Sequence, residues 1–173
     1  MQSQIEKHTD RTKRLTAGAL FAAVALIFSY IEAILPLSVG IPGVKLGIAN
    51  LVVLIAIYKM NFRYAFLINM IRIFVSGLLF SGVFGMIYSF AGGMLSLLVM
   101  FLLKKTRLFS IVGVSMAGGF AHNMGQLLVA AFVVSNIRMF LYLPVLMFSG
   151  IISGILIGFL AYFVVRKLPA SLF

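Results

Sequence analysis

The sequence has no cysteine, and only three of its 173 residues are acidic. Without cysteine, the chain can form neither a disulfide framework nor a thiolate metal site. Three acidic residues are too few for the aspartate-rich cluster that holds magnesium against a diphosphate. The sequence also lacks a GxxxxGK(S/T) loop for nucleotide phosphates, and no Ser–His–Asp set is plausible. These absences predict that the chain is not an enzyme and binds no metal.

Apolar residues dominate the remaining composition. They make up 63% of the chain, the mean hydropathy is +1.18, and charged residues account for 10%. A soluble domain carries about 25% charged residues, so the composition predicts an integral membrane protein. The net charge of +11 would suggest nucleic acid in a soluble protein. Here the basic residues stand at the ends of apolar runs, which indicates topology signals and anionic-lipid contacts instead.

The apolar runs predict an all-α bundle of six transmembrane helices. The predicted spans are residues 16–35, 46–58, 64–80, 86–103, 108–134 and 140–165. The first has the length that a ~30 Å hydrocarbon core requires, whereas the second is short for a full span. The predicted organisation is a cytoplasmic N-terminal segment at 1–14, a transmembrane domain at 15–167 and a cytoplasmic tail at 168–173.

The basic residues predict the orientation of this bundle. With six spans, residues 1–14, 59–63, 104–107 and 166–167 share one side of the membrane and carry eleven basic residues. The opposite side holds only Lys45 and Arg138. The positive-inside rule therefore places both termini in the cytoplasm.

Residues 36–50, PLSVGIPGVKLGIAN, interrupt the apolar chain with two prolines, three glycines, a lysine and an asparagine. Proline lacks the amide proton that a helix needs, and glycine tolerates unusual backbone angles. Irregular backbone survives in a membrane only where protein or a water-filled cavity satisfies it. We expect this segment to cap or line a binding site, and a plain external connector is the alternative.

Ionisable residues within a membrane span are candidates for function because burying them is costly. Arg72 stands in the middle of its span, and Asn69 and Ser76 share its helix face by spacing. Glu32 either contacts a ligand or pairs with Arg72 or Lys45. If Glu32 pairs with one of these cations, the other leaves a positive charge near the loop. That charge favours a ligand with a carboxylate or phosphate group.

A second polar group consists of His122, Asn123 and Gln126, which by spacing project to one side of their helix. They form either a hydrogen-bonding wall for a polar ring or interhelical contacts worth about 1 kcal/mol each. Lys45 and Asn50 stand where the loop meets the second span, and amides at a helix start can help to hold an anion there.

Small residues recur at four-residue spacing on two spans. Ala19 and Ala23 lie on one face of the first span, and Gly150, Gly154 and Gly158 on one face of the last. Such faces allow another backbone to approach closely. For the glycine row we expect packing against another helix of the same chain.

Four segments resemble one known family. They read PGVKLGIANLVVL, INMIRIFVSGLLF, SFAGGMLSLLVM and GGFAHNMGQLLVA, and with the last span they cover nearly the whole chain. The family is the Gx transporter family, also labelled heptaprenyl diphosphate synthase component I. It is similar to the substrate-binding S components of energy-coupling-factor vitamin transporters.

The resemblance implies six helices, cytoplasmic termini and a substrate pocket near the outer face, capped by the first loop. It also implies that Ala19 and Ala23 face an energy-coupling membrane protein, because they match the alanine pattern of S components. Family members are linked with quinone biosynthesis and with flavin-based extracellular electron transfer in Gram-positive bacteria. A synthase activity conflicts with the sequence, because its only aspartate is Asp10 in the N-terminal segment.

The leading hypothesis is a multi-pass subunit of a bacterial cell membrane that captures a small anionic or aromatic metabolite, such as a vitamin or a quinone or flavin precursor. A separate module with ATPases would energise uptake, and no resident cofactor is required. The predicted ligand contacts are Arg72, Asn69, Lys45, Asn50, Glu32, His122, Asn123 and Gln126. One alternative is a membrane subunit of a flavin- or quinone-based electron-transfer pathway. Another is an accessory component of prenyl diphosphate or menaquinone synthesis.

Overall fold

The computed structural model describes residues 2–34 and 47–169, and nearly all of them are helical. No described residue lies in a β-strand, which confirms the predicted all-α fold. A π-helical turn at Gly77–Ser81 and a 3-10 helix at Ile137–Tyr142 precede α4 and α6. The α-helices are α1 Gln2–Ile34, α2 Ile48–Lys59, α3 Phe62–Ser76, α4 Gly82–Thr106, α5 Ile111–Val134 and α6 Leu143–Lys167.

Four stretches of the described chain are long and apolar enough to cross a membrane: Arg11–Ile34, Phe62–Thr106, Ile111–Val134 and Ile137–Lys167. The chain is therefore built to lie in a membrane. In Phe62–Thr106 the chain reverses direction at Gly82, whose φ of 66° is readily accessible only to glycine. The side chain of Asn69 on α3 meets Gly93 on α4, and Gly77 meets Met86. These pairings make α3 and α4 antiparallel neighbours.

Helix α2 is short and lies at the centre of the bundle. Nine consecutive residues, Ala49–Ile57, are buried, so the helix is enclosed on all sides. Two lysines lie at its C-terminal end, one bonding a carbonyl of α2 and the other a carbonyl that follows α6. Lys104 donates to the carbonyl oxygen of Ile57, and Lys59 donates to that of Leu168 at 2.6 Å. Basic groups at this position satisfy carbonyls that have no partner within the helix.

Helices α5 and α6 pack at backbone contact through glycines. A Cβ atom added to Gly119 would lie 2.2 Å from the carbonyl oxygen of Gly150, and one added to Gly154 would lie 2.7 Å from Cα of Met116. Gly158 likewise lies against Val112. The prediction that the glycine row of the last span packs within the chain is confirmed.

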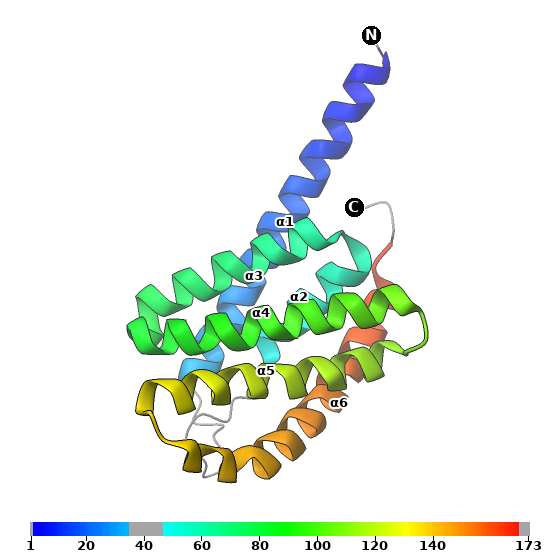
Figure 1. Ribbon diagram of the computed structural model, residues 1–173. Helices are drawn as coiled ribbons and strands as arrows, with labels where there is room; N and C mark the ends of the chain where they lie inside the picture. The colour runs from blue at the N-terminus through cyan, green and yellow to red at the C-terminus, as the bar shows by residue number, and fades with distance from the viewer. Residues whose placement is uncertain (1, 35–46, 170–173) are drawn as a thin grey trace.

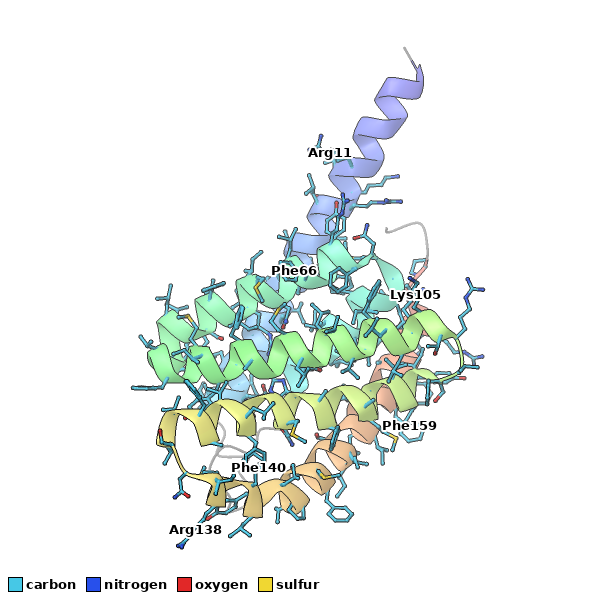
Figure 2. The ribbon with its side chains drawn as sticks, in the orientation of Figure 1. Arg11, Phe66, Lys105, Arg138, Phe140 and Phe159 are labelled. Atoms are coloured by element: carbon cyan, nitrogen blue, oxygen red, sulfur yellow. The ribbon has the colours of Figure 1, made fainter. Side chains whose placement is uncertain are left out.

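The connections separate the bundle into two ends. Figure 1 shows the α2–α3 and α4–α5 turns and the end of α6 at one end, and the α3–α4 and α5–α6 connections at the other. The N-terminal part of α1 projects beyond the bundle on the first side (Figure 1). Lys105 and Arg138 lie at opposite ends, as Figure 2 shows. The two ends are referred to below as the basic end, which carries Lys105, and the opposite end.

Candidate functional site

Arg72 lies on α3 with its guanidinium inside the bundle, and its side chain is 7% exposed. Its Nη2 atom donates to Oδ1 of Asn69 at 2.8 Å and to Oδ1 of Asn50 on α2 at 3.4 Å. Both partners are neutral amides. Within the described chain, Nε of Arg72 is buried and has no hydrogen-bond partner. The structure thus brings Arg72, Asn69 and Asn50 together as predicted.

Asn69 and Gly93 hold this arginine in place. Asn69 is fully buried, and its Nδ2 donates to the backbone oxygen of Gly93 on α4 at 3.1 Å. A Cβ atom on Gly93 would lie 3.3 Å from both Nη2 of Arg72 and Nδ2 of Asn69. Glycine at this position therefore makes the room that the two polar side chains occupy.

Glu32 is directed at the start of α2. Its Oε1 accepts a hydrogen bond from the backbone N–H of Ile48 at 2.7 Å. A carboxylate is favourable there because the first amides of a helix have no partner within the helix and carry partial positive charge. Glu32 also attracts Arg72 through space, but no direct hydrogen bond or ion pair joins the two within the described chain. The simple pairing of Glu32 with Arg72 that the sequence left open is therefore not what the structure shows.

A polar cavity of about 30 Å³ lies between Arg72 and Glu32. That volume holds one or two water molecules. Hydroxyl groups predominate among the side chains around it. Its lining residues are Ser29, Glu32, Ala33, Gly47, Arg72, Ser76, Ser81, Ser89 and His122.

A smaller polar cavity of about 10 Å³ continues between α2, α4, α5 and α6. Gly47 and His122 line both cavities, and Asn50 and Asn123 line this one. Oγ of Ser96, also on its wall, is buried and has no hydrogen-bond partner among the described residues. Buried polar groups of this kind are usually satisfied by water or a ligand.

The three polar residues of α5 reach two neighbouring helices, although His122 and Asn123 both line the smaller cavity. His122 and Gln126 both face Gly92 of α4, where an added Cβ would lie 3.1 Å from the His122 ring and 2.9 Å from the Gln126 chain. Asn123 faces α6 and donates to the carbonyl oxygen of Leu146 at 2.7 Å. Consecutive positions on a helix point about 100° apart, so His122 and Asn123 reach different neighbours. Gln126 lines neither cavity among the described residues.

Two groups of predicted residues remain. Residues 36–46 of the predicted capping loop, which include Lys45, lie outside the described part of the chain. Ala19 and Ala23 are exposed on α1, whereas Gly18, Ala22 and Ala25 of the same helix are buried. Helix α1 therefore packs into the bundle with one small-residue face and leaves a second one uncovered.

The profile of the heptaprenyl diphosphate synthase component I family matches residues 21–164. The chain belongs to this family. The match confirms the resemblance to the Gx transporter family. Comparison with curated proteins and with solved structures gave no match. The matched part of this family member contains every described residue of both cavities.

The sequence pattern indicated Ser76 but not the other serines of the Arg72 cavity, Ser29, Ser81 and Ser89, nor two nearby glycines. Ser29 precedes Glu32 by three residues, so the two share a face of α1, and that spacing could have indicated Ser29. Gly92 and Gly93 stood in the segment SFAGGMLSLLVM, but only the packing of α4 against α3 and α5 reveals their role. Ser81 and Ser89 come from a turn and a helix whose approach to Arg72 no local pattern predicts.

Proposed function

We propose that this membrane protein is a substrate-capture subunit that binds a small metabolite with an anionic group at Arg72. The observation that carries the proposal is the buried guanidinium of Arg72, which contacts only neutral amides within the described chain. Keeping a cation inside an apolar bundle without a directly bonded anion is costly, and such residues mark ligand or ion sites. A ligand carboxylate or phosphate would supply the missing partner.

The hydrogen-bonding groups around Arg72 suit such a ligand. Arginine binds carboxylate and phosphate through two parallel N–H donors, and the Nε atom of Arg72 is free to donate within the described chain. Serine hydroxyls from α1, the α3–α4 connection and α4 line the same cavity. The cavity is smaller than the 300–1,000 Å³ typical of ligand pockets, so binding requires the surrounding helices to move outward.

The proposed topology has six membrane crossings with both termini in the cytoplasm of a bacterial cell. The support is the concentration of basic residues at one end, on the α2–α3 turn, the α4–α5 turn and the end of α6. Short loops rich in lysine and arginine remain on the cytoplasmic side. In this orientation the Arg72 cavity lies toward the outer face, where a substrate arrives.

Capture alone does not move a substrate, so uptake requires a coupling partner. We assign contact with an energy-coupling membrane protein to the exposed face of α1 that carries Ala19 and Ala23. Small residues allow close approach of another helix. A separate ATPase module would drive release, because the sequence has no phosphate-binding loop of its own.

The test is native mass spectrometry of gently purified complexes of the wild type and of Arg72→Gln. The variant should lose a retained anionic metabolite and still co-purify with the coupling module. Arg138→Gln, which removes an exposed arginine at the opposite end, is the matched control and should retain the metabolite. Undiminished retention in Arg72→Gln, with an unchanged helical circular dichroism spectrum, would remove Arg72 from the site.

A second variant separates ligand capture from coupling. Ala23→Leu enlarges an exposed side chain of α1 without entering the bundle. It should reduce co-purification of the coupling protein and leave the bound metabolite in place. Loss of the metabolite together with the partner would show that α1 affects the site itself.

The family description favours one further candidate, an accessory membrane component of prenyl diphosphate synthesis. In that role the chain would hold a soluble synthase at the membrane, since three acidic residues cannot form the metal site of such an enzyme. Co-purification of a soluble synthase chain, with no ATPases present, would support this candidate. A bound flavin or quinone beside redox partners would support the electron-transfer alternative instead.

A further inference from the structure

A third polar cavity lies at the basic end of the molecule, far from Arg72. Its volume is about 110 Å³, and its lining residues are Arg14, Lys59, Met60, Asn61 and Tyr64. Arg14 and Glu32 are 18 positions apart on the single helix α1, which corresponds to about 27 Å at 1.5 Å per residue. This cavity and the Arg72 cavity are therefore separate sites on opposite halves of the bundle.

The described residues that line this cavity offer hydrogen-bond donors and no carboxylate. Among its described lining residues two are cationic and none is acidic. Nζ of Lys59 uses one of its protons for the carbonyl oxygen of Leu168 at 2.6 Å, and an ammonium group has three. Oδ1 of Asn61 accepts from the backbone N–H of Tyr64 at 3.2 Å, so the amide NH₂ of Asn61 is not used in that bond.

The frame of the cavity is built by close packing of α1 against α3. A Cβ atom added to Gly18 would lie only 3.2 Å from Cδ1 of Tyr64 and 3.8 Å from Cε of Met60. Glycine at this position therefore lets Tyr64 rest on α1 one turn beyond Arg14. The bond to Leu168 in turn fixes Lys59 to the chain that follows α6. Two independent contacts therefore fix two of the lining residues, Tyr64 by its packing on Gly18 and Lys59 by its bond to Leu168.

We propose that this cavity binds an anionic phosphate group at the membrane surface. A guanidinium, an ammonium and an amide NH₂ from three positions are the donors that phosphate oxygens require. The volume of about 110 Å³ has room for a phosphate group together with water. The phosphate belongs either to an anionic phospholipid or to a soluble compound. This proposal does not rest on substrate capture at Arg72.

The experiment titrates the purified full-length protein in detergent with phosphatidylglycerol and, separately, with phosphatidylcholine of the same chain length. Native mass spectrometry follows the first bound lipid. Wild-type protein should prefer phosphatidylglycerol, and Arg14→Gln should weaken that first binding step about fivefold, the effect expected for one basic residue at an anionic lipid surface. Lys13→Gln removes a neighbouring exposed charge that does not line the cavity and should weaken binding clearly less than Arg14→Gln does.

Two results would overturn the proposal. Equal weakening in Arg14→Gln and Lys13→Gln would show a general charge effect, and equal affinity for the two wild-type lipids would show no selection for an anionic phosphate. Asn61→Ala is a second probe that leaves the net charge unchanged, and it should also weaken phosphatidylglycerol binding. Excess inorganic phosphate distinguishes a soluble phosphate ligand from a lipid. If it displaces phosphatidylglycerol, a phosphate group alone is enough for binding; if the lipid stays bound, the site requires the lipid. Retained binding of the metabolite at Arg72 in Arg14→Gln would show that the two sites are independent.

Discussion

Replacing Gly119 by alanine should separate α5 from α6. The new Cβ atom would lie 2.2 Å from the carbonyl oxygen of Gly150 and 3.1 Å from its carbonyl carbon, whereas ordinary contact begins at 3.4 Å. Both obstructing atoms belong to backbone within a helix, so no side-chain rotation can relieve the overlap. The two helices must move apart by roughly 1 Å along a contact that Gly154 and Gly158 continue.

The magnitude follows from comparison with a second glycine of the same helix. A Cβ atom on Gly113 would have its nearest neighbours at 3.6 and 3.7 Å, which is ordinary contact. Both substitutions gain about 0.5–1 kcal/mol from restricting the backbone within a helix. Only Gly119→Ala introduces overpacking, which costs about 1–3 kcal/mol. The free energies of unfolding of the two variants should therefore differ by about 1–3 kcal/mol, with Gly113→Ala the more stable.

Unfolding by sodium dodecyl sulfate in mixed micelles, followed by far-ultraviolet circular dichroism, measures this difference. Gly113→Ala should unfold at the same or higher denaturant than the wild type, and Gly119→Ala at lower denaturant. Equal stability of the two variants would refute the argument that backbone contact at Gly150 holds α5 against α6. Loss of stability in Gly113→Ala alone would contradict the assigned environments of both glycines.

Three further predictions concern the Arg72 cavity and its walls. Glu32→Gln keeps an acceptor for the start of α2 but removes a negative charge, so an anionic ligand should bind more tightly; weaker binding in a ligand titration would contradict this. Gly93→Ala brings a Cβ atom within 3.0 Å of Cδ1 of Ile73 and 3.3 Å of Nη2 of Arg72, so retained metabolite should fall while overpacking lowers the free energy of unfolding by at most about 3 kcal/mol; unchanged retention counts against the site. Asn123→Ala removes the 2.7 Å bond to Leu146 and should cost about 0.6–1 kcal/mol in the same detergent unfolding assay; a neutral effect would show that water replaces the amide.

Much of the fold could be predicted from the sequence because apolar runs and their interruptions report helices directly. The predicted short second span at 46–58 corresponds to α2 at Ile48–Lys59. The basic segment at residues 104–107 marks the end of α4. Within the polar segment 1–14, the described residues are helical, because α1 begins at Gln2. Charged side chains do not oppose helix formation in water. A drop in hydropathy at the start of α1 therefore indicates where the membrane-spanning part begins, and it does not indicate where the helix begins.

Neighbours within the candidate site could be predicted only where both residues lie on the same helix. Asn69 and Arg72 share a face of α3 by spacing, and the structure bonds them to each other. The partner of Glu32 could not be predicted, because the N–H of Ile48 becomes available only where α2 happens to start. The divergence of His122 and Asn123 was missed for a similar reason. Consecutive positions of α5 point about 100° apart, but only the positions of α4 and α6 decide which neighbour each residue reaches.

The shortness of α2 explains why the polar groups gather where they do. Its 12 residues extend about 18 Å, against a hydrocarbon core of about 30 Å. Its C-terminal end is held at the basic end by Lys104, so its first turn lies within the depth of the bundle. The amides of that turn carry partial positive charge, and the side chain of Asn50 joins the turn to Arg72. Glu32 occupies the amide of Ile48, as an anionic ligand group would. A short helix that points its first turn into the bundle, beside a buried arginine, is an arrangement suited to accepting an anion there.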